Sequence, residues 1–380
     1  MRGRWLWTAL AALSLLPGII RSASSQDIKT EVAIDLQKTV ALVKQWGTRP
    51  SFPESVTFAY YHVYMLRALG QEITPEIRKS ISGYIAGCQQ PDGGFTPAPV
   101  HAKTANVIYS YYALKTLDLL GETKVIDSKA VTGFLLARIQ EDGGLVATAK
   151  EGERANLATT YYGIEALRLL GAVTSLDKTK TIDFIQRYRE QGQGFTRVEG
   201  GVSTPQSTFM GVRALKSLGA LTKQDRSEVV TYLKGTRYSG LNKDRQYKLL
   251  PNIEAMAATL EALAVLSAVQ EIDSEKVYEF ISSLYVPDNG GFGPRPGLGT
   301  TPPGTYYAIL SLVHLGKLPD PLIRKRVPGS TAAPLVVESR CCLPINIWFG
   351  LSVRKNRADN VIPGHSTQTG YPSLASSNIP

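Results

Sequence analysis

Residues 89–121 decide the fold, and they read QQPDGGFTPAPVHAKTANVIYSYYALKTLDLLG. A glycine turn opens this stretch, a tyrosine pair lies inside it, and Leu-Gly closes it. Residues 140–171 repeat the arrangement as QEDGGLVATAKEGERANLATTYYGIEALRLLG, with all three features at matching positions. Self-similarity over this distance is typical of repeat architectures, in which stacked units share one continuous core.

Two of these features, the glycine turn and the Leu-Gly pair, mark each copy and recur along most of the chain at intervals close to 50 residues. The last glycines of the turns are Gly94, Gly144, Gly194, Gly240 and Gly291. The Leu-Gly marks end at Gly70, Gly121, Gly171, Gly219 and Gly316. Ser267 takes the place of that glycine in the fifth copy. Two independent marks that keep one period indicate six copies of a single unit.

Each copy contains two helical patterns, because apolar residues recur at three- and four-residue spacing between the marks. One helix ends at Leu-Gly, where glycine suits the left-handed residue that follows a helix. We predict these helices over residues 54–70, 104–120, 155–170, 204–218, 252–266 and 302–315. Their partners begin after capping residues such as Thr74 and Asp127. We predict the partners over residues 28–46, 75–88, 127–139, 177–189, 222–234 and 273–285.

These twelve helices predict an all-α fold of six helical hairpins. Alternating hairpins can stack as an open solenoid or close into a ring, and six pairs is the number that closes an α6/α6 toroid. We therefore predict one α/α toroid repeat domain over residues 26–318.

The two ends of the chain do not carry the repeat. Residues 1–25 combine Arg2 and Arg4 with an apolar run and the small residues that follow it, which is typical of a secretory signal peptide. The alternative is an uncleaved N-terminal anchor. We expect a secreted, periplasmic or secretory-lumen protein, with no transmembrane span after signal removal. Residues 319–380 read as a disordered or spurious extension.

The net charge of +10 at first suggests a nucleic-acid partner. The signal segment holds three basic and no acidic residues, and the extension holds seven basic and three acidic ones. The repeat body keeps 32 basic against 29 acidic residues, so we expect no nucleic acid. Three cysteines and four histidines also exclude a disulfide scaffold and a His-rich metal cluster.

Aromatic residues fall in register when the copies are aligned on Leu-Gly. The candidate cavity-lining residues are Tyr60, Tyr61, Tyr111, Tyr112, Tyr161, Tyr162, Phe209, Tyr306 and Tyr307. Copy five has Ala257 and Ala258 at these positions, which predicts the roomiest wall there. A tyrosine joins an apolar ring to a polar tip, which suits an isoprenoid chain. The alternative is that these rings only pack between helices.

Five residues before each pair stands a polar residue that can cap the helix. These residues are Ser55, Asn106, Asn156, Thr204, Asn252 and Thr301. They predict ordinary helix caps, with a ring of helix N-termini around an anionic headgroup as the functional alternative.

The glycine turns, the Leu-Gly mark and the six-pair count resemble the prenyltransferase/squalene-cyclase repeat superfamily. The resemblance covers residues 27–318, and it is closest in look to the β subunits of protein geranylgeranyltransferases. It implies the α6/α6 toroid more specifically than it implies one activity.

The resemblance implies a zinc site at positions that are Asn252, Glu254 and Gly304 in this chain. Asparagine is a poor zinc ligand and glycine offers none, so only Glu254 could bind the metal. The diphosphate-binding histidine of the family falls on Thr204. A basic pair of the family matches Arg245 and Lys248 loosely. We expect no metal and no other cofactor; zinc is the cofactor only if a geranylgeranyltransferase-like activity holds.

Three further sequence features bear on catalysis by an acid, a thiol or a histidine. The acidic Asp-x-Asp-Asp run of the superfamily's cyclases is missing from the sequence. Cys88 reads as a buried thiol, and His62 as a packed histidine with a general base as its alternative role.

The sequence predicts an exported toroid that binds a hydrophobic, isoprenoid-like ligand or a protein partner, without zinc-dependent prenyl transfer. One alternative is an enzyme, either geranylgeranyltransferase-like or a terpene-cyclase- or lyase-like one that uses a rim acid such as Glu254. The other is a scaffold whose ring serves only for docking.

Overall fold

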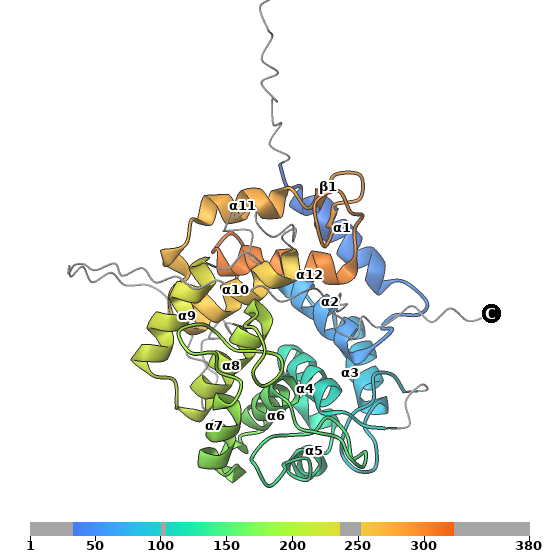
Figure 1. Ribbon diagram of the computed structural model, residues 1–380. Coiled ribbons are helices and arrows are strands. Elements are labelled where there is room, and N and C mark those ends of the chain that lie inside the picture. The colour runs from blue at the N-terminus through green and yellow to red at the C-terminus, as the bar shows by residue number, and fades with distance from the viewer. Residues whose placement is uncertain (1–32, 100–103, 236–251, 323–380) are drawn as a thin grey trace, which may run out of the picture. The chain divides into compact units, whose positions relative to one another are not determined.

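The computed structural model describes residues 33–99, 104–235 and 252–322 (Figure 1). The predicted signal peptide, the glycine turn at Gly240, most of the C-terminal extension, and the rim candidates Arg245 and Lys248 lie outside the described residues.

Six inner helices are present within the described part of the chain. They are α2 (Val56–Ala68), α4 (Val107–Leu120), α6 (Leu157–Leu169), α8 (Pro205–Leu218), α10 (Ile253–Val265) and α12 (Pro302–His314). The helices predicted to end at the Leu-Gly mark are these six. Ser267, which replaces glycine after α10, adopts the same left-handed backbone, with φ of 52°.

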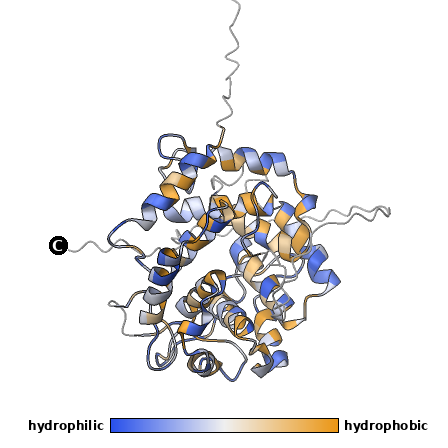
Figure 2. Ribbon diagram, turned by 180° about the vertical axis from the view of Figure 1, so that it is seen from behind, coloured by the Kyte–Doolittle hydropathy of each residue, from blue (hydrophilic) through white to orange (hydrophobic). Residues whose placement is uncertain are grey.

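The outer helices alternate with the inner ones along the chain. They are α1 (Leu36–Gly47), α3 (Pro75–Gly87), α5 (Ser128–Leu136), α7 (Lys178–Gln186), α9 (Lys223–Gly235) and α11 (Ser274–Ser282). Hydrophobic and hydrophilic residues alternate along them in Figure 2, as expected for helices with one face on the core and one in water.

The first outer helix begins later than the sequence pattern predicted. The prediction started it at residue 28, but residues 33–35 precede the helix. Asp35 ends the non-helical segment, because its Oδ1 accepts the backbone N–H groups of Gln37 and Lys38 at 3.0 and 3.1 Å. The sequence pattern also missed several short elements, which are η1 (Thr123–Val125), η2 (Val173–Ser175), η4 (Val269–Glu271), β1 (Tyr285–Val286) and β2 (Gly291–Phe292).

The inner helices form a closed ring, since each packs on the next and α12 packs on α2 (Figure 1). The outer layer closes at the same place. The Thr39 hydroxyl of α1 donates to the carbonyl of Gly290 at 2.7 Å, and Lys38 Nζ donates to the carbonyl of Pro287 at 3.0 Å. The first helix thus packs against the last glycine turn, and the predicted toroid is confirmed.

Each described glycine turn is fastened to the inner helix that follows it. The backbone N–H after the glycines donates to a hydroxyl located immediately before the aromatic pair. These bonds join Phe95 to Ser110 at 3.1 Å, and Leu145 to Thr160, Phe195 to Thr208 and Phe292 to Thr305 at 3.0 Å each. The contact that holds the turn therefore also sets the position of the aromatic residues on the helix.

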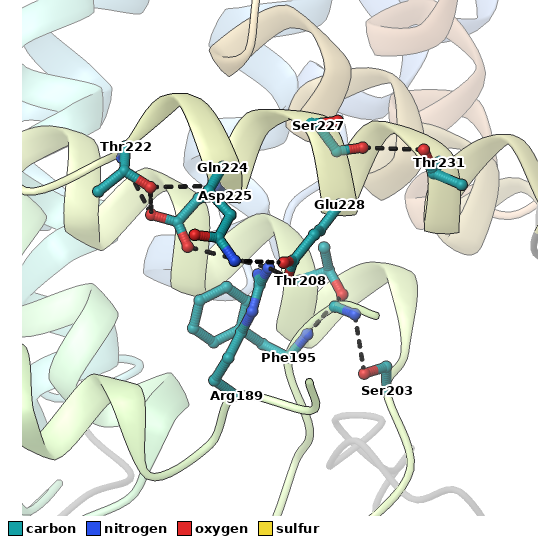
Figure 3. A network of polar contacts seen from close by, with 11 residues as sticks. Arg189, Phe195, Ser203, Thr208, Thr222, Gln224, Asp225, Ser227, Glu228 and Thr231 are labelled. Carbon is teal, nitrogen blue, oxygen red and sulfur yellow. Dashed lines mark hydrogen bonds and ion pairs between the residues drawn. The ribbon is translucent and has the colours of Figure 1, made fainter. Parts of the chain in front are cut away.

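Outer helices hold the same turns through ion pairs, as the network at α9 shows (Figure 3). Arg189 pairs with Glu228 at 2.7 Å and with Asp225 at 3.8 Å, and its guanidinium lies 5.0 Å from the ring centroid of Phe195. Asp225 also receives the N–H of Thr222 at 2.9 Å, which caps the helix. These charged residues have a structural role in joining one repeat to the next.

Candidate functional site

The aromatic side chains of neighbouring inner helices form a continuous wall. Tyr61 stacks on Tyr306 with ring centroids 4.0 Å apart, and Tyr60 contacts Tyr112 at 5.5 Å. The wall continues to α6 and α8 through the pairs Tyr111–Tyr161 at 6.1 Å and Tyr161–Phe209 at 5.5 Å. The structure therefore brings the predicted tyrosines from α12, α2, α4 and α6, and Phe209 from α8, into one cluster. That they line a ligand cavity stays a prediction.

The two positions of each pair differ in burial. The first tyrosine is buried in all four pairs, whereas Tyr112, Tyr162 and Tyr307 remain half-buried. Copy five carries no ring here, because its residues Ala257 and Ala258 are both buried. Three of the four tyrosines at the second position therefore keep part of their surface accessible, and α10 contributes no ring at either position of the pair.

Burial raises the pKa of several phenol groups in this wall. The hydroxyls of Tyr61 and Tyr307, and those of Tyr112 and Tyr162, lie 3.5 Å apart. Burial raises the pKa of Tyr60 to about 12, although Lys115 lowers it. Burial likewise holds the pKa of Tyr112 and Tyr307 well above the ordinary value. The wall thus offers apolar rings with neutral polar tips.

A second layer of side chains, here called the charged layer, lies four residues further along each inner helix. Residues separated by four positions share one face of a helix, so this layer lies on the same side as the first residue of each aromatic pair. Its members are Tyr64, Lys115, Glu165, Arg213, Glu261 and Leu310. The aligned repeat marks do not point to this layer, although four of its members, each four residues after an aromatic-pair position, carry charges of alternating sign.

Glu165 is the neutralised member of the charged layer. It is 2% exposed, and its carboxylate pairs with Arg168 and Arg213 at 3.1 Å each. The Ser217 hydroxyl donates to the same carboxylate. Burial alone would raise the pKa of Glu165, but Arg213, Arg168 and Ser217 outweigh burial and hold it below the ordinary value. Glu165 is therefore a fixed negative charge that joins α6 to α8.

Glu261 is the ionisable member of the charged layer. Among the described residues, no side chain forms a hydrogen bond or an ion pair with it. Burial raises its pKa to about 7, against the opposing influence of Lys115 and Arg213. Its charge also affects the pKa of Tyr60, Tyr161 and Tyr306, which belong to α2, α6 and α12. Glu261 stands four residues after Ala257, on the helix face that carries the aromatic residues in the other copies, and its carboxyl group is electrostatically coupled to residues of all five other inner helices.

Lys115 extends from α4 toward the same region. Its ammonium lies 5.5 and 5.7 Å from the ring centroids of Tyr60 and Tyr111, which is cation–π distance. Within the described ranges it has no carboxylate partner in ion-pair contact.

The predicted rim residues cap their own helices. Asn252 Oδ1 accepts the N–H of Ala255 at 2.8 Å, and Thr204 Oγ1 accepts that of Ser207 at 3.2 Å. The other four polar residues of the set make the same kind of bond: Ser55 to Phe58, Asn106 to Ile108, Asn156 to Thr159 and Thr301 to Gly304. The capping interpretation is therefore confirmed, and these side-chain oxygens are already in use.

The residues at the zinc positions implied by the resemblance do not fit the metal. A Cβ atom at Gly304 would lie 2.7 Å from the carbonyl oxygen of Phe292, so the backbone leaves no room for a ligating side chain. Asn252 uses its oxygen as a cap, which leaves only Glu254. Glu254 is half-buried, burial raises its pKa, and its charge influences the pKa of Tyr61 and Tyr307. One carboxylate cannot supply a tetrahedral site.

Two further residues singled out from the sequence, His62 and Cys88, are both buried. His62 is buried against the ring of Phe52, 4.5 Å between centroids, and burial lowers its pKa to about 4. Its ring also lies beside Gly47 at the end of α1, which places it on the outer side of α2. Cys88 is buried and its thiol pKa is raised to about 12 by burial. Neither residue reaches the aromatic wall.

Comparison with known families agrees with the closed ring of six hairpins. Residues 50–249 and 252–330 match the prenyltransferase alpha-alpha toroid domain. The chain belongs to this family. No curated protein sequence shows significant similarity to this toroid.

Solved structures share the fold of this toroid at low sequence identity. Protein geranylgeranyltransferase-I of Candida albicans, complexed with GGPP, is 17% identical, with a TM-score of 0.63 over 73% of this chain and 90% of that one. The type II terpene cyclase MstE from Scytonema is 14% identical, with a TM-score of 0.52 over 74% of this chain and 96% of that one. A complex of an MstE variant with its substrate, geranylgeranyl dihydroxybenzoate, is 13% identical and has a TM-score of 0.52, covering 74% and 95%.

None of the helices described has the length and apolar composition that a bilayer crossing requires. In the same part of the chain, no three His, Cys, Asp or Glu side chains gather closely enough to hold a metal ion.

Proposed function

We propose that this toroid binds an elongated hydrophobic molecule of the isoprenoid class inside its ring, without zinc-dependent prenyl transfer. The observation that carries the proposal is the continuous aromatic wall from α12 to α8, in which Tyr112, Tyr162 and Tyr307 keep free surface. Neutral phenols can contact an unsaturated hydrocarbon chain without loss of hydration of a charge. The similar toroids supply further support, since one is complexed with GGPP and another with a geranylgeranyl compound.

The absence of zinc chemistry in this proposal rests on Gly304 and Asn252. The backbone around Gly304 leaves no space for a ligating side chain, and the side-chain oxygen of Asn252 caps α10.

An enzymatic version of the same proposal is favoured by Glu261. A carboxylic acid with a pKa of about 7 can hold a proton near neutral pH and transfer it to a bound substrate, as general acids do. In this version the acid is Glu261 in the charged layer, in place of the rim residue Glu254. New products after incubation of the protein with geranylgeraniol, detected by mass spectrometry and lost in Glu261→Gln, would establish it.

Binding is tested with geranylgeraniol as the probe and with two variants of one residue. Tyr112→Ala removes a half-buried ring from the wall, and we expect about thirtyfold weaker binding because burial of such a ring contributes on the order of 2 kcal/mol. Tyr112→Phe keeps the ring and is the matched control, with binding within about threefold of the wild type. Tryptophan and tyrosine fluorescence titration measures both affinities.

Two outcomes would contradict the binding proposal. One is that the wild-type protein shows no saturable binding, which would favour a scaffold that only docks a protein partner. The other is that Tyr112→Ala binds as tightly as Tyr112→Phe while circular dichroism shows both variants folded.

The proposal that the protein is exported rests on residues 1–25 alone. We propose that the signal peptide is removed and that the mature protein acts outside the cytosol. Expression of the full chain in a eukaryotic secretory host, followed by N-terminal sequencing, is expected to yield a mature end shortly after Ser22–Ser24. An intact Met1 in protein recovered from the cytosol would overturn this part.

A further inference from the structure

Two members of the charged layer, Lys115 and Glu261, carry ionisable groups that the fold leaves without ion-pair partners in the described residues. Both side chains are partly exposed, although they belong to inner helices. The ammonium of Lys115 lies over two aromatic faces, those of Tyr60 and Tyr111. Charged groups in such surroundings usually have a partner, because an unpaired charge away from bulk water is costly.

Glu165, by contrast, is a charged member of this layer whose partners all lie within the fold. Its carboxylate accepts hydrogen bonds from Arg168, Arg213 and Ser217, so both of its oxygens have donors. The layer then holds two cations, Lys115 and Arg213, against one fixed anion, with Glu261 as a second anion only when it is ionised. The charged layer therefore has an excess of one positive charge while Glu261 is protonated.

We propose that the charged layer binds the carboxylate of a hydrophobic acid, with Lys115 and Arg213 as its cationic contacts and Glu261 as a hydrogen-bond donor. The inference rests on the proposed function, because the apolar chain of the same molecule lies against the aromatic wall. It adds a ligand class and an orientation, with the polar end of the ligand at the charged layer.

The size of the charge excess favours a carboxylate. One singly charged anion pairs with the free ammonium of Lys115, and the remaining guanidinium surface of Arg213, which already bonds Glu165 through Nε, can share it. A diphosphate brings more negative charge than the layer can balance beside Glu165 and Glu261. An alcohol would leave Lys115 without a counter-charge, so we expect it to bind more weakly.

The spacing of the two layers suits one amphipathic molecule. Tyr111 and Lys115 are four residues apart on α4, which is about 6 Å along the helix axis. A carboxylate at Lys115 therefore brings the first carbons of its chain beside Tyr111 and Tyr60. The half-buried rings of Tyr112 and Tyr162 can then contact the rest of the ligand's chain.

Glu261 makes this binding dependent on pH. The groups that shift its pKa are Lys115 of α4 and Arg213 of α8, and its own charge acts on tyrosines of the other inner helices. Those tyrosines are Tyr60, Tyr61, Tyr64, Tyr161 and Tyr306. Below its pKa of about 7, Glu261 is protonated and can donate to a carboxylate, and above that pH it repels one. Acid binding should therefore weaken as pH rises from 6 to 8.

The test compares a C20 isoprenoid carboxylic acid with the alcohol of the same chain, in isothermal titration of the full-length protein. We expect the acid to bind about tenfold more tightly than the alcohol at pH 6. Lys115→Met keeps the length of the side chain and removes the charge, so it should reduce acid affinity about tenfold and alcohol affinity little. Lys276→Met, at an exposed lysine of α11, is the matched control and should change neither.

A second variant tests the pH dependence independently of Lys115. Glu261→Gln retains a donor but cannot ionise, so acid binding should become nearly constant between pH 6 and 8. The two proposals fail in different ways. If neither probe binds, both are wrong; if both probes bind equally and Lys115→Met changes neither affinity, only the carboxylate inference is wrong.

Discussion

Replacement of Glu165 by glutamine is expected to lower the free energy of unfolding by about 3 kcal/mol, because it removes the only fixed anion of the charged layer. The Glu165 side chain is 3% exposed, and its cationic partners Arg168 and Arg213 are each 27% exposed. Glutamine has nearly the same volume, so the loss comes from two guanidinium groups that keep their burial without their counter-charge. Urea unfolding followed by circular dichroism measures the change.

The pH dependence of stability separates this ion pair from simple packing. Since the folded-state pKa of Glu165 lies below the ordinary value, its contribution is fully present above the unfolded pKa, near 4.3. The contribution is lost as pH falls through the lower folded value. The difference in stability between wild type and Glu165→Gln should therefore shrink below about pH 4.

A double variant provides the internal control for this ion pair. Arg213→Met in the Glu165→Gln background removes one of the unpaired cations and should recover part of the lost stability. Glu275→Gln, at an exposed position on α11, should have almost no effect. If Glu165→Gln is as mild as Glu275→Gln, the charged layer does not hold α6 and α8 together.

Replacement of Gly143 by alanine is expected to lower the free energy of unfolding by about 3 kcal/mol, from two additive causes. Gly143 has φ of +85°, a region that costs an L-residue about 1 kcal/mol. An added Cβ would also lie 2.4 Å from the carbonyl carbon of Lys180 and 2.5 Å from the nitrogen of Thr181. These are backbone atoms of α7, so relief needs a shift of the helix, at about 2 kcal/mol.

Gly152 offers a control with the same backbone and no neighbour. Its φ is +73° and an added Cβ meets nothing within 4 Å, so Gly152→Ala should cost only about 1 kcal/mol. The difference between the two variants isolates the contact between the glycine turn and the next outer helix. Equal losses in thermal and urea unfolding would show that this contact does not limit stability.

Local sequence signals predicted most of the helices. The Leu-Gly mark located the ends of the inner helices because a left-handed residue after a helix is a local requirement, and even Ser267 meets it. Asp127, Asp177 and Asp273 located the starts of outer helices through side-chain bonds to nearby N–H groups. The start of α1 was predicted too early, because its apolar pattern extends beyond the cap at Asp35.

The site was less predictable than the helices. The alignment of repeats found the aromatic pairs, since they recur at one register, but it passed over Lys115 and Glu261, whose identities change from copy to copy. The failure of the zinc positions was visible in the residue types. Its steric cause at Gly304 was not, because Phe292 approaches from the preceding turn.

The sequence by itself determined the repeat, the helices, their caps and the aromatic register, since each depends on residues close together in the chain. Only the tertiary structure decided which side chains meet across the ring. The closure of α12 on α2 brings Tyr306 to Tyr61, 245 positions earlier in the numbering. The same closure brings Glu261 close to charged groups on other inner helices, and desolvation in this position raises its pKa to about 7, against the opposing influence of Lys115 and Arg213. Desolvation and charge coupling depend on distances in space, so no local pattern could have supplied them.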